Sequence, residues 1–435
     1  MQVSLALLGH RRFGPLFGTQ LLGAFNDNLF KFAMVVLVIY EIYSDPAREF
    51  QFSALATGLF ILPFFLFSAM AGQLADNHDK AKIIRIVKTA EIFIALAGAA
   101  GLILQSIPLM LLALFALGVQ STFFGPIKYA ILPQHLERNE VLGGTGLVEA
   151  GTYIAILCGT ILGGVIVDLF GAGWAAAFVL GVALLGRLCA HYVPPAPAQK
   201  EPEPIDYNIL RSSWRLVNGT LHIRRLFLAI VSISFFWTIG SVLVIQFPPL
   251  VKNVLTADPT VASLFLGVFS IGIAIGSILI NRLLRGRVSA RFAPVSVLAM
   301  GGFVLVLYFI AKSWVGLPGE ALYDLGEFMA LSNAWAVLLT LLGIAMAGGM
   351  FVVPLYAFLT TTVELSQTAR TVAANNVVNS GCMVLGALAA FGLSLVGVST
   401  TEQLFLVAAM CLVAAWLAWL LHKACDLPLA SAPAE

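Results

Sequence analysis

Residues 13–40 read FGPLFGTQLLGAFNDNLFKFAMVVLVIY, an apolar run that is interrupted near its middle by Asn26, Asp27, Asn28 and Lys31. The run is long enough for one membrane-spanning helix, which needs about 20 mostly apolar residues. An acid or base at the bilayer centre costs roughly 2.5–3.5 kcal/mol on insertion scales, so such residues face protein or a wet cavity and commonly handle substrate. Asp27 and Lys31 are one helical turn apart, and we expect them to share a face and partly neutralise each other. The stretch therefore predicts a polar site inside a membrane.

The composition of the whole chain is that of a membrane protein. Hydrophobic residues make up 60% of its 435 residues and charged residues only 11%, and the mean hydropathy is +0.96. Soluble globular domains do not have such a composition. The net charge of +2 gives no reason to expect a nucleic-acid partner. The membrane bilayer is therefore the expected surroundings of the chain.

Long apolar runs separated by polar, Pro or Gly residues predict about twelve spanning helices. We expect them at 13–41, 52–75, 81–105, 107–132, 141–168, 172–193, 225–250, 260–283, 290–312, 332–360, 368–396 and 402–423.

Basic residues are distributed unevenly between the two sides of these helices, and by the positive-inside rule the richer side is cytoplasmic. Only Arg48, Lys252 and Lys312 fall on the poorer side. Both termini are then expected in the cytoplasm, as an even number of helices requires. The richer side holds Arg11, Arg12, Lys80, Lys82, Arg85, Lys88, Arg138, the basic residues between 200 and 225, Arg282, Arg285, Arg287 and Arg291.

A polar interval rich in Pro and charge divides the chain near its middle. We expect an N-terminal six-helix bundle over 1–193, a cytoplasmic linker with an amphipathic segment over 194–224, a C-terminal six-helix bundle over 225–425 and a tail over 426–435. The amphipathic segment is expected on the membrane surface. The predicted fold class is an all-α membrane protein with two six-helix bundles, the layout of a two-half transporter.

The two halves also resemble each other in sequence. The stretch FGPIKYAIL at 124–132, followed by TGLVEAG at 145–151, has its counterpart in VVPLYAFL at 352–359 and NNVVNSG at 375–381. The offset of about 228 to 230 residues is what parallel repeats would show. Glu149 then aligns with Asn379, while Lys128 has no counterpart, so the second half lacks charges that the first half keeps.

The segment GQLADNHDKAK at 72–82 joins the second and third predicted helices. It resembles the cytoplasmic loop motif of the major facilitator superfamily, with Asp79 where that family usually has Gly. We expect Asp76 to cap the following helix and to pair with a basic residue in one conformation. Gly72, Asp76, Lys80 and Lys82 are therefore predicted to control gating, although a simple capped turn would show the same pattern.

A narrower resemblance lies in GAFNDN at 23–28, FGPIKYAIL at 124–132, GLVEA at 146–150 and GMFVVPL at 349–355. Together these stretches are similar to the lysophospholipid transporter family within that superfamily. The resemblance implies movement of lysophospholipids from the outer to the inner leaflet of a bacterial inner membrane. It also implies reacylation there by a partner acyltransferase and acyl-carrier-protein synthetase. That family carries a basic residue in the seventh helix, where residues 232–250 hold only neutral polar side chains.

A lysophospholipid needs an anion, a cation and an apolar surface. Asp27, with Asn26 and Asn28, is expected to receive an ammonium or a glycerol hydroxyl, and Lys128 to meet the phosphate. We also assign Lys31, Glu149 and Asn379 to the substrate site. For each residue the alternative is structural: an Asp27 ion pair that fixes helix packing, a Lys128 side chain that reaches the membrane interface, or a Glu149 hydrogen bond between helices.

Glu91 lies near the centre of the third predicted helix and is our candidate for proton coupling, unless it only satisfies a neighbouring hydroxyl. Two other functions remain open: a proton-coupled carrier for small amphiphiles or drugs, and a membrane scaffold for acyltransferase machinery. No arrangement of residues typical of an enzyme, a metal site or a nucleotide loop is present. We expect no enzyme activity, cofactor, metal or nucleic-acid partner, and a monomer.

Overall fold

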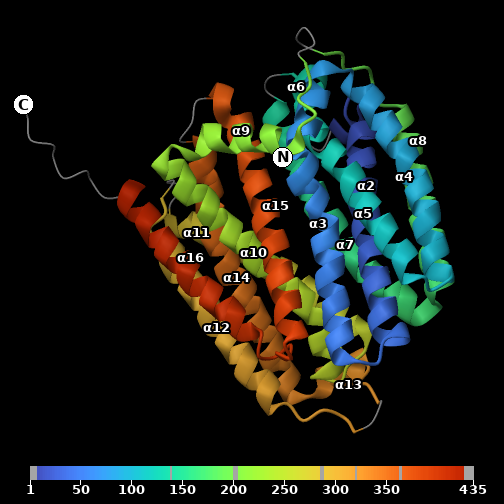
Figure 1. Cartoon of the computed structure of the whole chain (residues 1–435), viewed down its shortest axis with the longest axis vertical. Coiled ribbons are helices and arrows are strands. Elements are labelled where there is room, and N and C mark those ends of the chain that lie inside the picture. Colours follow the sequence, from blue (N-terminus) through green and yellow to red (C-terminus); the bar gives the residue numbers. More distant parts are fainter. Residues whose placement is uncertain are drawn as a thin grey trace, which may run out of the picture. The chain divides into compact units, whose positions relative to one another are not determined.

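The computed structural model describes residues 7–137, 140–198, 204–284, 289–318, 321–361 and 365–425, without the side chains of some helical positions. Within these ranges the chain is almost entirely α-helical (Figure 1). The one extended pairing in this part of the chain is an isolated bridge between Ala257 and Tyr323. The predicted tail, 426–435, lies outside the described residues.

The first part of the chain forms a short 3₁₀ turn, a long helix that ends in a π-helical turn, and then a series of helices. The elements are η1 (Leu7–Gly9), α2 (Gly14–Leu37), η2 (Val38–Ile42), α3 (Pro46–Asn77), α4 (Lys80–Ile103), α5 (Ile107–Ala130), α6 (Leu132–His135), α7 (Val141–Phe170), α8 (Ala172–His191) and α9 (Ile209–Leu221).

The second part has the same character. Its elements are α10 (Arg224–Asn253), α11 (Pro259–Leu284), α12 (Ala293–Ser313), α13 (Leu325–Ala330), α14 (Ser332–Thr361), α15 (Leu365–Leu395) and α16 (Leu404–Cys425).

Each of the twelve predicted ranges overlaps one long helix, and the expected all-α membrane fold is confirmed. Eleven helices in the described part of the chain are long and apolar enough to span a membrane. The apolar part of α7 within the described residues, Ile154–Phe170, is shorter. The largest difference in a boundary is at α3, which begins at Pro46 rather than at 52. The helix can start this early because Asp45 accepts a hydrogen bond from the Ala47 N–H and because Pro is favoured in a first helical turn. Arg48 and Glu49 are therefore helical.

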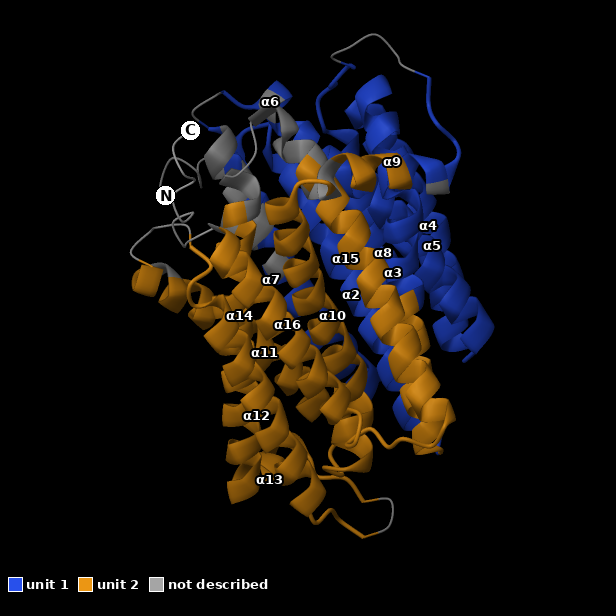
Figure 2. Cartoon of the chain, turned by 60° about the vertical axis from the view of Figure 1, so that its left-hand side comes forward, with its two compact units in different colours: residues 1–44, 59–213 blue, residues 45–58, 214–435 orange. Residues whose placement is uncertain are grey.

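The chain divides into two compact units (Figure 2). Unit 1 contains residues 1–44 and 59–213, and unit 2 contains residues 45–58 and 214–435. The division falls inside two helices, because the first residues of α3 belong to unit 2 and the rest to unit 1, and α9 is divided after Ser213. In unit 2 the start of α3 is held by Glu49, whose two carboxylate oxygens accept from Lys252 Nζ and Asn253 Nδ2, each at 2.6 Å.

Four helix pairings recur in the two units. In unit 1, α2 packs on α7 and α8, and α4 packs on α5 and α8. In unit 2, the corresponding helices pair in the same way: α10 with α15 and α16, and α12 with α14 and α16. These four pairings agree with the sequence repeat between the halves and are what parallel internal repeats would show.

Glycines allow α2 and α7 to approach closely. A Cβ atom at Gly163 would lie 2.6 Å from the Leu29 carbonyl oxygen, and one at Gly159 would overlap with the Phe25 carbonyl. Small residues spaced by four commonly let membrane helices meet backbone to backbone. The glycines of α7 are therefore what permits the largest contact of α2, the helix that carries the polar site.

The loop between α3 and α4 differs from the sequence prediction, because the residue that caps α4 is Asp79 and not Asp76. Asp79 Oδ1 accepts from the backbone N–H groups of Ala81 at 2.8 Å and Lys82 at 3.2 Å. Asp76 is exposed and lies in the last turn of α3, which extends to Asn77. The prediction was wrong because α3 continues two residues past its expected end, which moves the position before the next helix to Asp79.

The loop also holds the start of the linker. Asp79 Oδ1 lies 3.3 Å from the donating N–H of Ala196, and the Lys80 N–H donates to the Ala196 carbonyl at 2.9 Å. The side chain of Gln73 donates to Ser212 Oγ and accepts from the Asp206 N–H, both at 2.7 Å. Asp79 and Gln73 thus fix the linker, including the first residues of α9, against the end of α3.

We predict that Gly163→Leu disrupts the packing of α2 on α7 and lowers the unfolding temperature of the detergent-purified protein by several degrees, because a side chain there meets backbone atoms that cannot move away. Gly181→Leu is the matched control, since nothing lies within 4 Å of a Cβ at that helical position. Equal unfolding temperatures of the two variants would contradict the described contact.

We predict that Asp79→Ala destabilises the protein by about 1 kcal/mol, the usual effect of losing a helix cap. Asp76→Ala should leave stability unchanged within about 0.5 kcal/mol, as most exposed substitutions do. Comparison of the denaturation midpoints of the two variants checks the assignment. A larger effect at Asp76 would return the capping role to that residue.

Candidate functional site

The polar residues of α2 lie inside unit 1. Asn26, Asp27 and Asn28 are all buried. Asn28 bonds within its own helix, since its Nδ2 donates to the Ala24 carbonyl at 2.8 Å. Asn26 and Asp27 instead contact α4 and α5, respectively. Adjacent residues on a helix point about 100° apart, so α2 presents one polar side chain to each of these neighbours.

The Asp27 carboxylate is bonded to two consecutive residues of α5. Its Oδ1 accepts from Gln120 Nε2 at 3.4 Å, and its Oδ2 accepts from the Ser121 hydroxyl. Gln120 Nε2 also lies 3.1 Å from Ser121 Oγ. Hydrogen bonds from neutral donors are a usual way to hold a carboxylate away from water. Neither Gln120 nor Ser121 was predicted, because single neutral polar residues in an apolar helix carry no sequence signal of their own.

Asn26 joins a buried ion pair on α4. Its Nδ2 donates to Glu91 Oε1 at 3.2 Å, and Glu91 Oε2 lies 2.5 Å from Lys88 Nζ. Both charged side chains are only 1% exposed. A buried ion pair stabilises a protein only where further hydrogen bonds satisfy its atoms, and Asn26 supplies one. Glu91, the predicted proton-coupling residue, is thus held by a cation and an amide.

Lys88 corrects a sequence interpretation, because it had been counted among the basic residues on the cytoplasmic side. Its side chain is instead enclosed in unit 1. The Nζ lies 5.3 Å from the centroid of the Phe124 ring, and a Cβ atom at Gly23 would overlap with it. Lys88 and Glu91 are three residues apart on one helix, so the pair could have been recognised from its spacing. Only the packing decides that this face of α4 points inward.

Lys31 lies one turn from Asp27, as predicted, and its Nζ is 5.2 Å from the centroid of the Phe60 ring. Asp27 is bonded to Gln120 and Ser121 of α5, whereas Lys31 contacts the Phe60 ring. The four charges of Asp27, Lys31, Lys88 and Glu91 sum to zero when all are ionised. We call these four residues, with Asn26, Gln120 and Ser121, the Asp27 cluster.

Lys128 belongs to a second polar group, nearer the other end of α2. Its Nζ lies 3.5 Å from Thr152 Oγ1, and the Thr152 hydroxyl donates to Gln20 Oε1 at 2.8 Å. Gln20 precedes Asp27 by seven residues, so both project from the same face of α2, about 10 Å apart along its axis. Lys128, which lies on α5, is thus linked through Thr152 to the face of α2 that carries Asp27. The side chain of Glu149 lies outside the described residues.

The buried polar residues of α10 and α15 in unit 2 are neutral. Asn379 is buried and its Oδ1 accepts from Ser234 Oγ at 2.6 Å. One turn before it on α15, Asn375 is 0% exposed, and neither polar atom of its side chain has a hydrogen-bond partner among the described residues. A buried amide without partners costs about 1–3 kcal/mol, so such a group is suited to a ligand or water. Residues 232–250, where the resemblance implies a basic residue that is missing here, lie in α10 and include Ser234.

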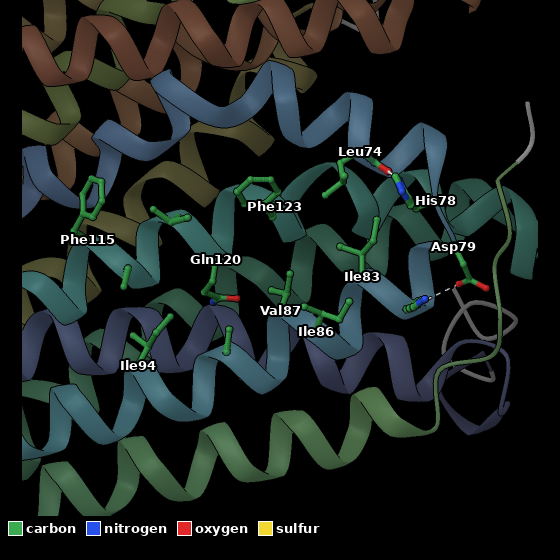
Figure 3. Close-up of a pocket in the computed structure, with 14 residues that line it drawn as sticks. Leu74, His78, Asp79, Ile83, Ile86, Val87, Ile94, Phe115, Gln120 and Phe123 are labelled. Atoms are coloured by element: carbon green, nitrogen blue, oxygen red, sulfur yellow. Dashed lines mark hydrogen bonds between the residues drawn. The ribbon is translucent and has the colours of Figure 1, made fainter. Parts of the chain in front are cut away.

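A groove of about 610 Å³ runs over α4 and α5 and past the end of α3 in unit 1 (Figure 3). His78, Asp79 and Lys82 line it where α4 begins, and aliphatic and aromatic side chains line the rest. Figure 3 places His78 and Asp79 at one end, Ile94 and Phe115 at the other, and Gln120 between them. Because Gln120 also bonds to Asp27, the groove reaches the Asp27 cluster. A charged end and an apolar wall suit an amphiphilic ligand.

A bundle of membrane-spanning helices in two units with repeated pairings, and with charged residues buried inside it, is the architecture of a secondary transporter. The sequence profile of the Major Facilitator Superfamily matches residues 16–387, and the chain belongs to this family. The predicted resemblance is confirmed: a protein of Salmonella newport called lysophospholipid transporter LplT is 27% identical over 383 residues, covering 84% of each chain. The same-named protein of Salmonella typhi is 27% identical over 387 residues.

Solved structures share the fold. The peptide-transporter-family protein PepTSo superposes with a TM-score of 0.69 at 14% identity, covering 95% of this chain and 98% of its own. A D-xylose-proton symporter gives a TM-score of 0.67 at 12% identity, with coverage of 93% and 96%. At these identities the likeness concerns the fold alone. The chain is a multi-pass membrane transporter, and its substrate must be inferred from the site.

We predict that Lys88→Met strongly destabilises the protein, by about 3–5 kcal/mol, because it leaves the Glu91 carboxylate buried without its cation. The double variant Lys88→Met with Glu91→Leu should recover most of that loss, which a double-mutant cycle measures as coupling. Lys82→Met, an exposed lysine on the same helix, is the control. Additive effects of the two substitutions would contradict a buried ion pair.

Proposed function

We propose that the protein moves lysophospholipids, such as lysophosphatidylethanolamine, from the outer to the inner leaflet of a bacterial inner membrane by alternating access. The observation that carries this proposal is the connection between the amphipathic groove and the Asp27 cluster through Gln120. The modest similarity to proteins called lysophospholipid transporters supports it.

Asp27 of α2 and Lys128 of α5 match the charges of a phospholipid head group. The Asp27 carboxylate would receive the ammonium or a glycerol hydroxyl, exchanging its bonds to Gln120 and Ser121 for bonds to the substrate. Lys128, held through Thr152 and Gln20, would meet the phosphate as a point charge. The single acyl chain would occupy apolar surface such as the groove wall.

The cost of moving a charged head group through the bilayer interior explains why such a site is needed. An isolated charge there is expensive, and a carrier lowers this cost by replacing water with fixed polar partners. The acyl chain needs no such partner, so a groove open to the outside of the helix bundle is sufficient for it. Lipid delivered to the inner leaflet would be a substrate for reacylation, and an acyltransferase would be the functional partner.

A second candidate function is a proton-coupled carrier for small amphiphiles. It is favoured by the buried Glu91, which is paired with Lys88 and accepts a hydrogen bond from Asn26, the residue before Asp27. Transfer of a proton to Glu91 would break that pair and release Lys88, which is a physical route from protonation to a change in packing.

We further propose that the loop between α3 and α4 controls gating, through Gly72, Asp76, Lys80 and Lys82. Asp79 joins these residues because it fixes the linker.

We predict that Asp27→Asn reduces uptake of labelled lysophosphatidylethanolamine into proteoliposomes by about tenfold or more, because a charge-assisted hydrogen bond contributes roughly 1.5–3 kcal/mol. Lys128→Ala should reduce uptake comparably. Asp168→Asn, an exposed acid of the same unit, is the matched control and should transport normally. Wild-type uptake by Asp27→Asn would remove that residue from the site.

An imposed proton gradient separates the two candidate functions in the same assay. Uptake that requires Asp27 and ignores the gradient is expected for a facilitated lipid transporter. Uptake that follows the gradient, and loses this dependence in Glu91→Gln, would favour the proton-coupled carrier. If the wild-type protein, folded by its unfolding curve, takes up no lysophospholipid, the lipid proposal is wrong.

A further inference from the structure

A second concentration of charge lies at the end of unit 1 where the N-terminal segment, the start of α4 and the end of α8 meet. Arg11, Arg12 and Arg85 line a pocket of about 380 Å³ there, together with His191 and Tyr192. The backbone from Val193 to Pro195 completes its wall. We call this the basic pocket. None of its residues belongs to the Asp27 cluster, to the Lys128 group or to the groove.

One of the three arginines is neutralised within the protein. Arg12 Nη2 lies 2.7 Å from Glu140 Oε1. The other Glu140 oxygen accepts from the Glu137 N–H at 2.9 Å, and this bond, followed by that from Arg12, holds the pKa of Glu140 below its usual value. The Glu140 carboxylate is thus a lasting partner of Arg12 near neutral pH, and it leaves the charges of Arg11 and Arg85 to be balanced.

Arg11 and Arg85 form no ion pair within the part of the chain that the structure describes. Arg85 Nη2 donates to the Val193 carbonyl at 2.8 Å, which fixes the guanidinium plane. The buried Arg85 Nε has no hydrogen-bond partner among the described residues. A buried donor without a partner is costly, and a guanidinium with a free edge is suited to an oxyanion. The basic pocket is therefore built for an anion.

The chemistry of the pocket favours phosphate. Arginine forks match the geometry of phosphate oxygens and can bind two of them at once. Two uncompensated charges also suit the negative charge of a phosphate ester. Arg85 supplies a fixed fork and Arg11, which is exposed, supplies a movable one.

The source of the phosphate follows from the surface of α8. Trp174, Phe178, Leu185, Leu188 and Tyr192 are all largely exposed and recur at helical spacing along one face. This apolar stripe faces the outside of unit 1, and its last residue, Tyr192, lines the basic pocket. On a helix that spans the membrane such a face contacts acyl chains. A phospholipid lying along α8 would place its phosphate beside Arg85.

We propose that the basic pocket binds the phosphate of an anionic membrane phospholipid whose acyl chains lie along the exposed face of α8. This lipid is a bound ligand and not the transported substrate. It would join three segments that line the pocket: the N-terminal segment, the first turns of α4 and the chain that leaves α8, the last two of which are also linked by the bond from Arg85 to Val193. The inference requires only that the chain spans a membrane and does not depend on which substrate is transported.

The test uses the full-length, delipidated protein in detergent, with native mass spectrometry to count bound phosphatidylglycerol against phosphatidylcholine of the same acyl chains. The wild-type protein is expected to retain phosphatidylglycerol preferentially. Arg11→Gln with Arg85→Gln should weaken its apparent affinity by about tenfold, which corresponds to about 1.4 kcal/mol. Arg187→Gln, an arginine of α8 outside the pocket that bonds to Thr89, is the matched control and should bind normally.

Two further measurements keep the outcome decisive. Arg11→Gln alone, at an exposed position, is expected to weaken binding without altering the unfolding temperature, so a folding defect from Arg85→Gln cannot imitate the result. Inorganic phosphate at millimolar concentration is added as a competitor. Unchanged phosphatidylglycerol binding in both arginine variants, or no preference over phosphatidylcholine, overturns the proposal. Displacement of the lipid by inorganic phosphate alone overturns the lipid assignment and gives the pocket to a soluble anion.

Discussion

The structure of unit 1 depends on the need to satisfy charged side chains that lie inside an apolar bundle. Lys88 and Glu91 are almost fully buried, and Asp27 is buried beside them. Each would be very costly alone, so α2, α4 and α5 must be placed so that these groups meet partners. The glycines at positions 23, 159 and 163 follow from the same constraint, because they let α2 approach Lys88 and α7. Packing and polar chemistry are therefore not separable in this unit.

The same constraint explains the difference between the two units. Four helix pairings recur in both units, yet inside the helix bundle unit 1 holds Asp27, Lys88 and Glu91, while α10 and α15 of unit 2 offer serine, threonine and asparagine. A repeated bundle can lose its charges on one side while its packing persists, because apolar contacts between helices do not depend on them. The charged groups that the proposed substrate would need are thus found in unit 1.

The buried charged side chains of unit 1 differ in the kind of partner that each one has. Asp27 is bonded to neutral donors, Glu91 to a cation and an amide, and Lys128 to a hydroxyl. Bonds from neutral donors are weaker than those between charges, so Asp27 is a group that a charged substrate can recruit, while the Lys88–Glu91 pair is the group that resists. This ordering separates residues expected to meet substrate from those expected to hold the bundle together.

The sequence by itself determined the membrane class, the twelve helical ranges and the repeat of the halves, and it predicted a role for Asp27, because hydropathy and the cost of a charge in hydrocarbon act along the chain and need no tertiary information. It also indicated the family. Only the tertiary structure decided which partners these residues have: that Lys88 points inward to Glu91, that Gln120 and Ser121 hold Asp27, and that Asp79 caps α4 in place of Asp76. These choices depend on which face of each helix meets a neighbour and on where a helix ends, and both are set by packing between segments far apart in the sequence.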